Sequence, residues 1–198
     1  MILSRQDLHE ISIVDDTAAA YARGYDLKFR KIFAGVGIEV ALSDEDLKIT
    51  GLGALGFGEI YVRDNSNTTT LKSAVKVQIT DFDTNGEALN MTPEHANDHI
   101  IVSVAGTYWV MVSIVVRNAA GSGHEIHVEL FKNNGATVVN NVHAHHDLSA
   151  STDAESISLN GIITAAADDT LELWADTDIA GNRNVIFEDL TFSVMRIK

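Results

Sequence analysis

The sequence contains no cysteine and no apolar run long enough to cross a membrane. The missing thiols exclude a disulfide scaffold, thiolate zinc sites and thiol catalysis, so stability must come from packing or from assembly. The N-terminal stretch MILSRQDLHE carries charge too early for a signal peptide. We therefore expect a soluble protein that is made in the cytoplasm and has no membrane partner.

Basic residues are scarce, because 14 lysines and arginines face 28 aspartates and glutamates and give a formal net charge of -14. The sequence shows no basic face with interspersed aromatic residues. Such an acidic chain is repelled by a polyphosphate backbone. We expect no nucleic acid among its partners.

Helical periodicity is nearly absent after residue 56, where apolar residues alternate with polar ones. IIVSVAGTYWVMVSIVVRN, residues 100–118, is expected to form one strand with a single apolar parity facing the core. That parity comprises Val102, Val104, Tyr108, Val110, Val112, Ile114 and Val116. LKSAVKVQIT, HEIHVELFKN, DTLELWADTD and FEDLTFSVMRIK show the same period, and in DTLELWADTD we expect Glu172, Trp174 and Asp176 to point outward. Several short strands without intervening helices predict an all-β sandwich or jelly roll.

Residues 1–55 differ in kind, and they predict an extended, β-rich N-terminal arm separate from a jelly-roll domain at residues 56–198. GIEVALSDEDLKIT is expected to form a hairpin that turns at residues 43–46, and DDTAAAYARG a short helical turn. The four glycines of GLGALGFG predict a flexible joint. The arm also holds the only basic cluster of the chain, Lys28, Arg30 and Lys31.

The stretch DFDTNGEALNMT, residues 81–92, begins like a calcium-binding loop. Asp81, Asp83, Asn85 and Gly86 occupy the opening positions of the EF-hand pattern. The twelfth position requires a bidentate glutamate and holds Thr92 instead. We therefore interpret this stretch as a turn that follows a strand.

Five of the eight histidines lie between positions 124 and 146. His143 and His145 would share one face of an extended segment, and a threefold axis could multiply them into a metal-binding ring. Against this, His127 has the outward parity of Glu125 and Glu129, and HAHHDLSAST has the composition of a solvated loop. We expect surface histidines without a bound metal or cofactor, although histidines near carboxylates could form a pH-sensitive contact.

No catalytic constellation can be identified in the sequence. Asp168 and Asp169 are adjacent, which is typical of a turn, and GLGALGFG lacks the lysine and the following helix of a nucleotide-binding loop. No nucleophile with its base and no paired carboxylates are evident. We predict that the protein is not an enzyme and has no catalytic residues.

Four apolar residues lie on the parity opposite the core of their own strands: Trp109, Met111, Phe131 and Trp174. Aromatic residues and methionine are enriched at subunit interfaces. We predict that these four residues form an interface between subunits. The alternative is that they pack beneath a second sheet or remain partly exposed.

Several motifs after residue 57 resemble those of the globular complement-head and tumour-necrosis-factor-like jelly rolls. Asn85 and Gly86 match the approach to the hallmark strand. Val104, Gly106 and Tyr108 match that strand, and Phe192 and Ser193 match the closing strand. The sequence departs from the eukaryotic members at Val194, where they usually have a small residue, and it has no collagen repeats upstream.

The sequence looks most like the jelly rolls of tailed bacteriophages, which join such a domain to an N-terminal β-rich arm in head decorations, head fibres and tail fibres. FGEIYVRDNSNTTTL is similar to the first strand of those domains. The resemblance implies a homotrimer around a threefold axis, with the arm attached to the virion.

The resemblance therefore predicts a virion structural protein, located on the capsid surface, that decorates the capsid as a cement or head-fibre protein. Its partners would be two further copies of itself and the major capsid protein or another virion protein. Lys28, Arg30 and Lys31 would anchor it to the capsid. The alternative is a receptor-binding tail-fibre or head-fibre module that recognises a bacterial surface.

Overall fold

The computed structural model describes residues 38–42, 47–51, 55–119, 123–150 and 152–198. The chain forms two compact units, residues 1–50 and 51–198. Strands β1 (Ile38–Leu42) and β2 (Leu47–Gly51) pair as a two-stranded sheet, as the predicted hairpin requires. The basic cluster of the arm and the segment DDTAAAYARG lie outside the described residues.

One sheet of the second unit is called the β9 sheet here, and its strands follow the order β12-β9-β14-β3-β6, with β4 paired to β14. All its pairings are antiparallel. The strands are β3 (Phe57–Val62), β4 (Thr69–Lys72), β6 (Thr84–Leu89), β9 (Gly106–Asn118), β12 (Glu155–Ala165) and β14 (Asn182–Arg196).

The other sheet, called the β10 sheet, has the order β11-β10-β13-β8-β7, with β5 paired to β13. It is also antiparallel. Its strands are β5 (Val77–Gln78), β7 (Met91–Glu94), β8 (His99–Val102), β10 (His124–Lys132), β11 (Thr137–Leu148) and β13 (Thr170–Thr177). A 3-10 helix, η2 (His95–Asn97), joins β7 to β8.

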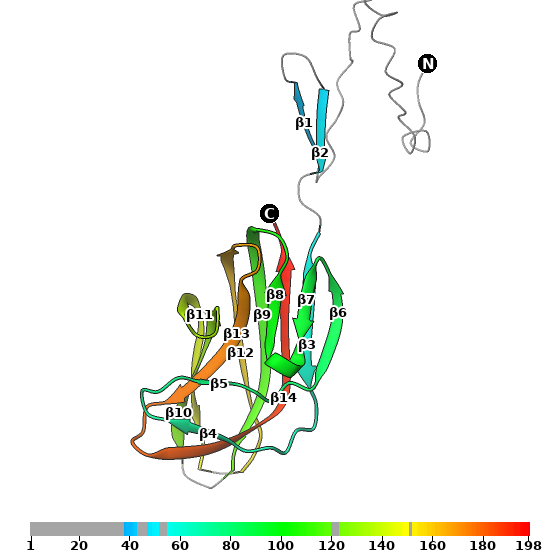
Figure 1. Ribbon diagram of the computed structural model, residues 1–198. Coiled ribbons are helices and arrows are strands. Elements are labelled where there is room, and N and C mark those ends of the chain that lie inside the picture. Colours follow the sequence, from blue (N-terminus) through cyan, green and yellow to red (C-terminus); the bar gives the residue numbers. More distant parts are fainter. Residues whose placement is uncertain (1–37, 43–46, 52–54, 120–122, 151) are drawn as a thin grey trace, which may run out of the picture. The chain divides into compact units, whose positions relative to one another are not determined.

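The two sheets pack face to face as a sandwich (Figure 1), and the chain passes repeatedly from one sheet to the other. From β8 onward, successive strands alternate between the two sheets, except that β10 and β11 form a hairpin within one sheet. This is the connectivity of a jelly roll. The core between the sheets is almost entirely aliphatic and aromatic. The all-β jelly-roll prediction is confirmed, whereas the trimer stays a prediction.

The prediction of which alternate side chains of the long strands face the core is confirmed at most positions. Val110, Ile114 and Val116 of β9 are fully buried, as are the apolar residues of β10 and of β13 that were expected to face inward. These last residues are Ile126, Val128, Leu130, Leu171, Leu173 and Ala175. A period of two residues specifies which side chains face the core even where it does not specify the sheet.

The prediction of one continuous strand over residues 100–118 is wrong. The chain leaves the β10 sheet at Val102 and enters the β9 sheet at Gly106, so Val104 lies in the connection and is exposed rather than in the core. The Tyr108 hydroxyl donates a hydrogen bond to the Val104 carbonyl and fixes this crossover. A Cβ atom at Gly106 would collide with the Lys198 carbonyl oxygen, which is why the crossover requires glycine.

The segment LKSAVKVQIT is also interrupted, because β4 ends at Lys72 and β5 begins at Val77. Ala74 has a φ of 55° in the intervening turn, and Val75 is exposed although it shares the parity of Leu71 and Ile79. Leu71 and Ile79, at the two ends of the segment, are fully buried. The single-strand prediction is therefore wrong between residues 73 and 76.

The stretch DFDTNGEALNMT does not wrap around a cation position. Asp81 is buried and accepts a hydrogen bond of 2.6 Å from the Thr69 hydroxyl, while Asp83 accepts one from Thr84. Asn85 lies within β6, and its side-chain oxygen accepts a hydrogen bond from the His95 amide. Residues 81–83 form an irregular connection rather than a turn, and β6 follows them from Thr84.

In the described part of the chain, no helix is long and apolar enough to span a bilayer.

Candidate functional site

Five exposed apolar side chains form one row across the outer face of the β9 sheet, and we call them the apolar row. The backbone register pairs Ile162 with Trp109, Trp109 with Met195, Met195 with Phe57, and Phe57 with Leu89. Their exposed fractions range from 36% at Met195 to 58% at Ile162. Side chains in register on neighbouring strands contact one another, so the row is one continuous apolar surface. Large exposed apolar surfaces mark sites of interaction, so the row is a candidate interface.

The four residues predicted to form a subunit interface divide between the two sheets. Trp109 belongs to the apolar row, and Met111 lies two residues further along β9 on the same face. Phe131 and Trp174 lie on the outer face of the β10 sheet, with ring centroids 5.5 Å apart. The four side chains therefore do not form one surface, and their role at an interface stays a prediction.

The sequence reasoning missed four members of the apolar row. Phe57 is the first residue of β3 and Leu89 the last residue of β6. At the end of a short strand, the alternation of apolar and polar residues gives little information on which face a side chain occupies. Ile162 and Met195 lie next to apolar residues of the core parity, so neither stands out by composition. Only the register of five strands shows that these residues are neighbours.

The outer face of the β10 sheet has a different character, because charged and imidazole side chains cover it. His127 of β10 lies between His145 of β11 and Asp176 of β13 in the register. Glu129 lies in the same way between His143 and Trp174. The expectation that HAHHD forms a solvated loop is wrong, since these residues belong to β11.

Asp176 holds one side of this cluster in place. Its Oδ1 atom lies 3.0 Å from His127 Nδ1 and 3.1 Å from Lys76 Nζ. The same Lys76 Nζ lies 3.1 Å from Glu129 Oε2. Because Asp176 is buried, its charge needs these partners.

Glu125 closes the other side of the cluster. Its Oε1 atom lies 3.1 Å from His145 Nδ1 and 3.4 Å from His127 Nε2. The two imidazole rings stack with centroids 4.0 Å apart and planes inclined by 19°. Glu125, His127 and His145 each offer one ligand atom, and these atoms all lie within 4.8 Å of one another. They are the described residues that could hold a metal ion.

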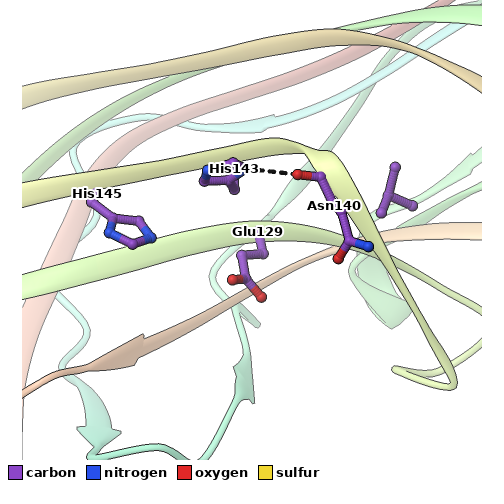
Figure 2. A pocket seen from close by; sticks show the side chains of 5 residues that line it. Glu129, Asn140, His143 and His145 are labelled. Carbon is purple, nitrogen blue, oxygen red and sulfur yellow. Dashed lines mark hydrogen bonds between the residues drawn. The ribbon is translucent and has the colours of Figure 1, made fainter.

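The structure does not bring His143 into that set. Figure 2 shows His143 and His145 on β11 beside Glu129 and Asn140, around a partly open hollow of about 190 Å³ that Val139 also lines. His143 Nδ1 lies 2.8 Å from the Asn140 carbonyl oxygen, and the His143 and His145 rings meet edge to face at 5.6 Å. The predicted pair shares a face, but His145 combines with residues of β10 instead.

Glu172 of β13 is fully buried, although the sequence pattern predicts that it points outward. Its carboxylate accepts hydrogen bonds from the amides of Asn134 and Gly135, at 2.8 and 2.9 Å, and from the Thr170 hydroxyl. The β10–β11 turn folds over the carboxylate and excludes water. Glu172 therefore fixes the turn that sets the β10–β11 register.

The largest shifts in carboxyl pKa among the described residues are at Asp98 and Glu155. Burial raises the pKa of Asp98 to about 6, even though the Phe82 amide donates a hydrogen bond to it. Hydrogen bonds from the Ser149 hydroxyl and amide, and a contact with His146, lower the pKa of Glu155 to about 2. These groups make stability depend on pH without forming a site.

Comparison with known proteins shows similarity in structure only. No protein-family model and no curated protein matches the chain. The chain is similar to the structure of Eiger TNF from S. frugiperda, with 14% identity and a TM-score of 0.49, over 72% of this chain and 94% of that chain. It is similar to the PRD1 vertex protein P5, with 13% identity and a TM-score of 0.48, over 85% of this chain and 86% of that chain. At TM-scores below 0.5, neither similarity carries an argument about function.

Proposed function

We propose that the protein is a structural component of a bacteriophage virion that decorates the capsid. In this proposal it assembles as a homotrimer through the outer face of the β9 sheet and attaches to the capsid through residues 1–55. It is made in the host cytoplasm, performs no catalysis and binds no nucleic acid. The apolar row is the observation that carries the proposal.

The composition of the row favours a protein partner. Trp109 and Phe57 are aromatic and Met195 is flexible and polarisable, and residues of these kinds are enriched at interfaces between proteins. The row is exposed in a chain with a net charge of -14, where charge alone already keeps the protein soluble. An exposed apolar surface of this kind is stabilised when a second surface covers it.

A further copy of the same chain is the occupant that we propose. The resemblance of the sequence to trimeric jelly rolls implies this partner, and the row belongs to the sheet that contains the hallmark strand residues Gly106 and Tyr108. Trp109 is the next residue in that strand. Three copies around a threefold axis would cover all three rows in one assembly.

The histidines of the sandwich make contacts that a purely structural role accounts for. Among the described residues, His99, His127, His145 and His146 pair with carboxylates, and His143 with a backbone carbonyl oxygen. These pairs hold strands together.

Attachment to the capsid is tested by deleting residues 1–55. The shortened chain should no longer sediment with capsids that lack the protein, whereas the full chain should bind them. Substituting Lys28, Arg30 and Lys31 together by glutamine should weaken binding by the full chain and flatten its salt dependence, because these residues form the only basic cluster. Equal capsid binding by both chains would contradict attachment through the arm, and binding of the shortened chain to host cells would support the receptor-binding alternative.

A further inference from the structure

Strand β11 lies at the edge of the β10 sheet and pairs with β10 alone. Glu125 and His127 stand on β10, and His145 stands opposite His127 on β11. We propose that these three side chains form a binding site for a divalent transition-metal ion such as Zn²⁺, which fastens the edge strand β11 to β10. This inference does not depend on the proposed function.

Two of the three separations between the ligand atoms fit a tetrahedral zinc ion, and all three atoms lie within 4.8 Å of one another. Two atoms that each lie about 2.1 Å from a tetrahedral zinc ion are about 3.4 Å apart. Glu125 Oε1 lies 3.1 Å from His145 Nδ1 and 3.4 Å from His127 Nε2. The His145 side chain is 49% exposed, so its ring has room to turn toward the ion. Three protein ligands leave the fourth position for water.

His127 has a carboxylate beside the ring nitrogen that would not bind the ion. Its Nδ1 atom lies 3.0 Å from the carboxylate of Asp176, and its Nε2 atom faces Glu125. A carboxylate that accepts the proton of one imidazole nitrogen directs the lone pair of the other nitrogen outward and raises its basicity. Asp176 is buried and also contacts Lys76, so it is held in position to orient the ring.

The local charge also favours a cation between the three residues. In the described part of the chain, the Glu125 carboxylate pairs with two imidazoles and with no lysine or arginine. Asp147 lies opposite Glu125 in the register and adds a second negative charge at the same edge. Two imidazole ligands select a transition metal over Ca²⁺ or Mg²⁺, which prefer oxygen ligands.

His143 provides a matched control, because it lies on the same strand and the same face but outside the ligand set. Its Nδ1 atom is engaged by the Asn140 carbonyl oxygen, as Figure 2 shows. Replacing His143 or His145 by alanine removes the same chemical group from β11. Only the second change removes a proposed ligand.

The test is calorimetric titration of the untagged, metal-free full chain with ZnCl₂ near neutral pH, with CaCl₂ as the comparison ion. We expect one Zn²⁺ per chain and no Ca²⁺. Asp176→Asn should weaken Zn²⁺ binding roughly 10–100-fold, as is typical for a partner that orients a ligand, and His145→Ala should weaken it further. His143→Ala should bind as the native chain does. Circular dichroism of each metal-free variant verifies that it is folded.

A second measurement reads the proposed location directly. Zn²⁺ should slow amide hydrogen exchange in β11 and β10 of the native chain and should have no such effect in His145→Ala. The site is disproved if the native chain binds no Zn²⁺. It is equally disproved if His145→Ala and His143→Ala bind alike, or if protection appears away from β10 and β11.

Discussion

Ile162 lies directly opposite Trp109 where β12 pairs with β9, and both side chains are exposed on the outer face of the sheet. If a second subunit covers this pair, a charge placed there would be buried without a partner, which is strongly unfavourable. We expect Trp109→Glu and Ile162→Glu each to convert the assembly to monomers with unchanged strand content. Analytical ultracentrifugation and circular dichroism check the two parts of this prediction.

Val138→Glu is the matched control for these two substitutions. Val138 and Trp109 are both 40% exposed, but Val138 lies on β11 of the other sheet. The control should assemble like the native chain. If the Val138→Glu variant is monomeric and the Trp109→Glu variant stays assembled, the interface lies on the β10 sheet, beside Phe131 and Trp174.

Asp98 should make the folded state less stable as the pH rises. Its pKa is raised from 3.8 to about 6 on folding, so between these values the folded state binds more protons than the unfolded state. Stability is therefore lost as the pH rises through this window, by roughly 2–3 kcal/mol at most.

Asp98→Asn should remove this pH dependence and stabilise the protein at neutral pH. Asparagine tolerates the left-handed backbone at this position, where φ is 54°, and its oxygen can still accept the Phe82 hydrogen bond. Urea unfolding at several pH values measures both effects. An unchanged pH profile would show that the Asp98 charge is not the cause.

Glu155 should act in the opposite direction and in a lower pH window. Its pKa is lowered from 4.5 to about 2, so its contribution is fully present above pH 4.5 and is lost as the pH falls toward 2. Glu155→Gln should lower stability above pH 4.5 and should have little effect near pH 2. Asp147→Asn, at an exposed position near the end of β11, is the control and should leave the difference in stability between these pH values unchanged. Equal losses for Glu155→Gln at both pH values would contradict the assignment.

Glu172→Ala should be among the most destabilising single substitutions in the sandwich. It would leave the partly buried amides of Asn134 and Gly135 without their acceptor, at a cost of about 1–3 kcal/mol. Gly135→Ala should also destabilise the turn, by about 1 kcal/mol or more, because φ is +74° and the new Cβ would lie 2.7 Å from the Trp174 ring. Chemical denaturation measures both losses. A loss below about 1 kcal/mol for Glu172→Ala would show that the turn does not depend on this carboxylate.

The inward parity of the strands was predictable because a period of two residues is a local property of the sequence. The connections were not, because alternation continues in phase from Val102 through Val104 to Tyr108 while the chain changes sheets. Strand parity also does not specify the sheet. The sequence pattern therefore predicts one surface for Trp109 and Trp174, although they lie on different sheets.

The polar clusters were less predictable than the core because they depend on register between strands. His145 meets His127 only because the turn at residues 133–136 and the irregularity between Glu129 and Phe131 set the β10–β11 alignment. Glu172 is buried by a turn 37 residues earlier in the chain. Spacing within one segment carried no signal for either contact.

The mass of the full chain in solution tests the central claim most directly. Multi-angle light scattering at micromolar concentration should give three times 21.4 kDa for the native chain. The melting temperature should rise with protein concentration, because subunits that share buried apolar surface stabilise one another by mass action. A mass of 21.4 kDa at these concentrations would contradict the proposal that the apolar row joins three copies of this chain.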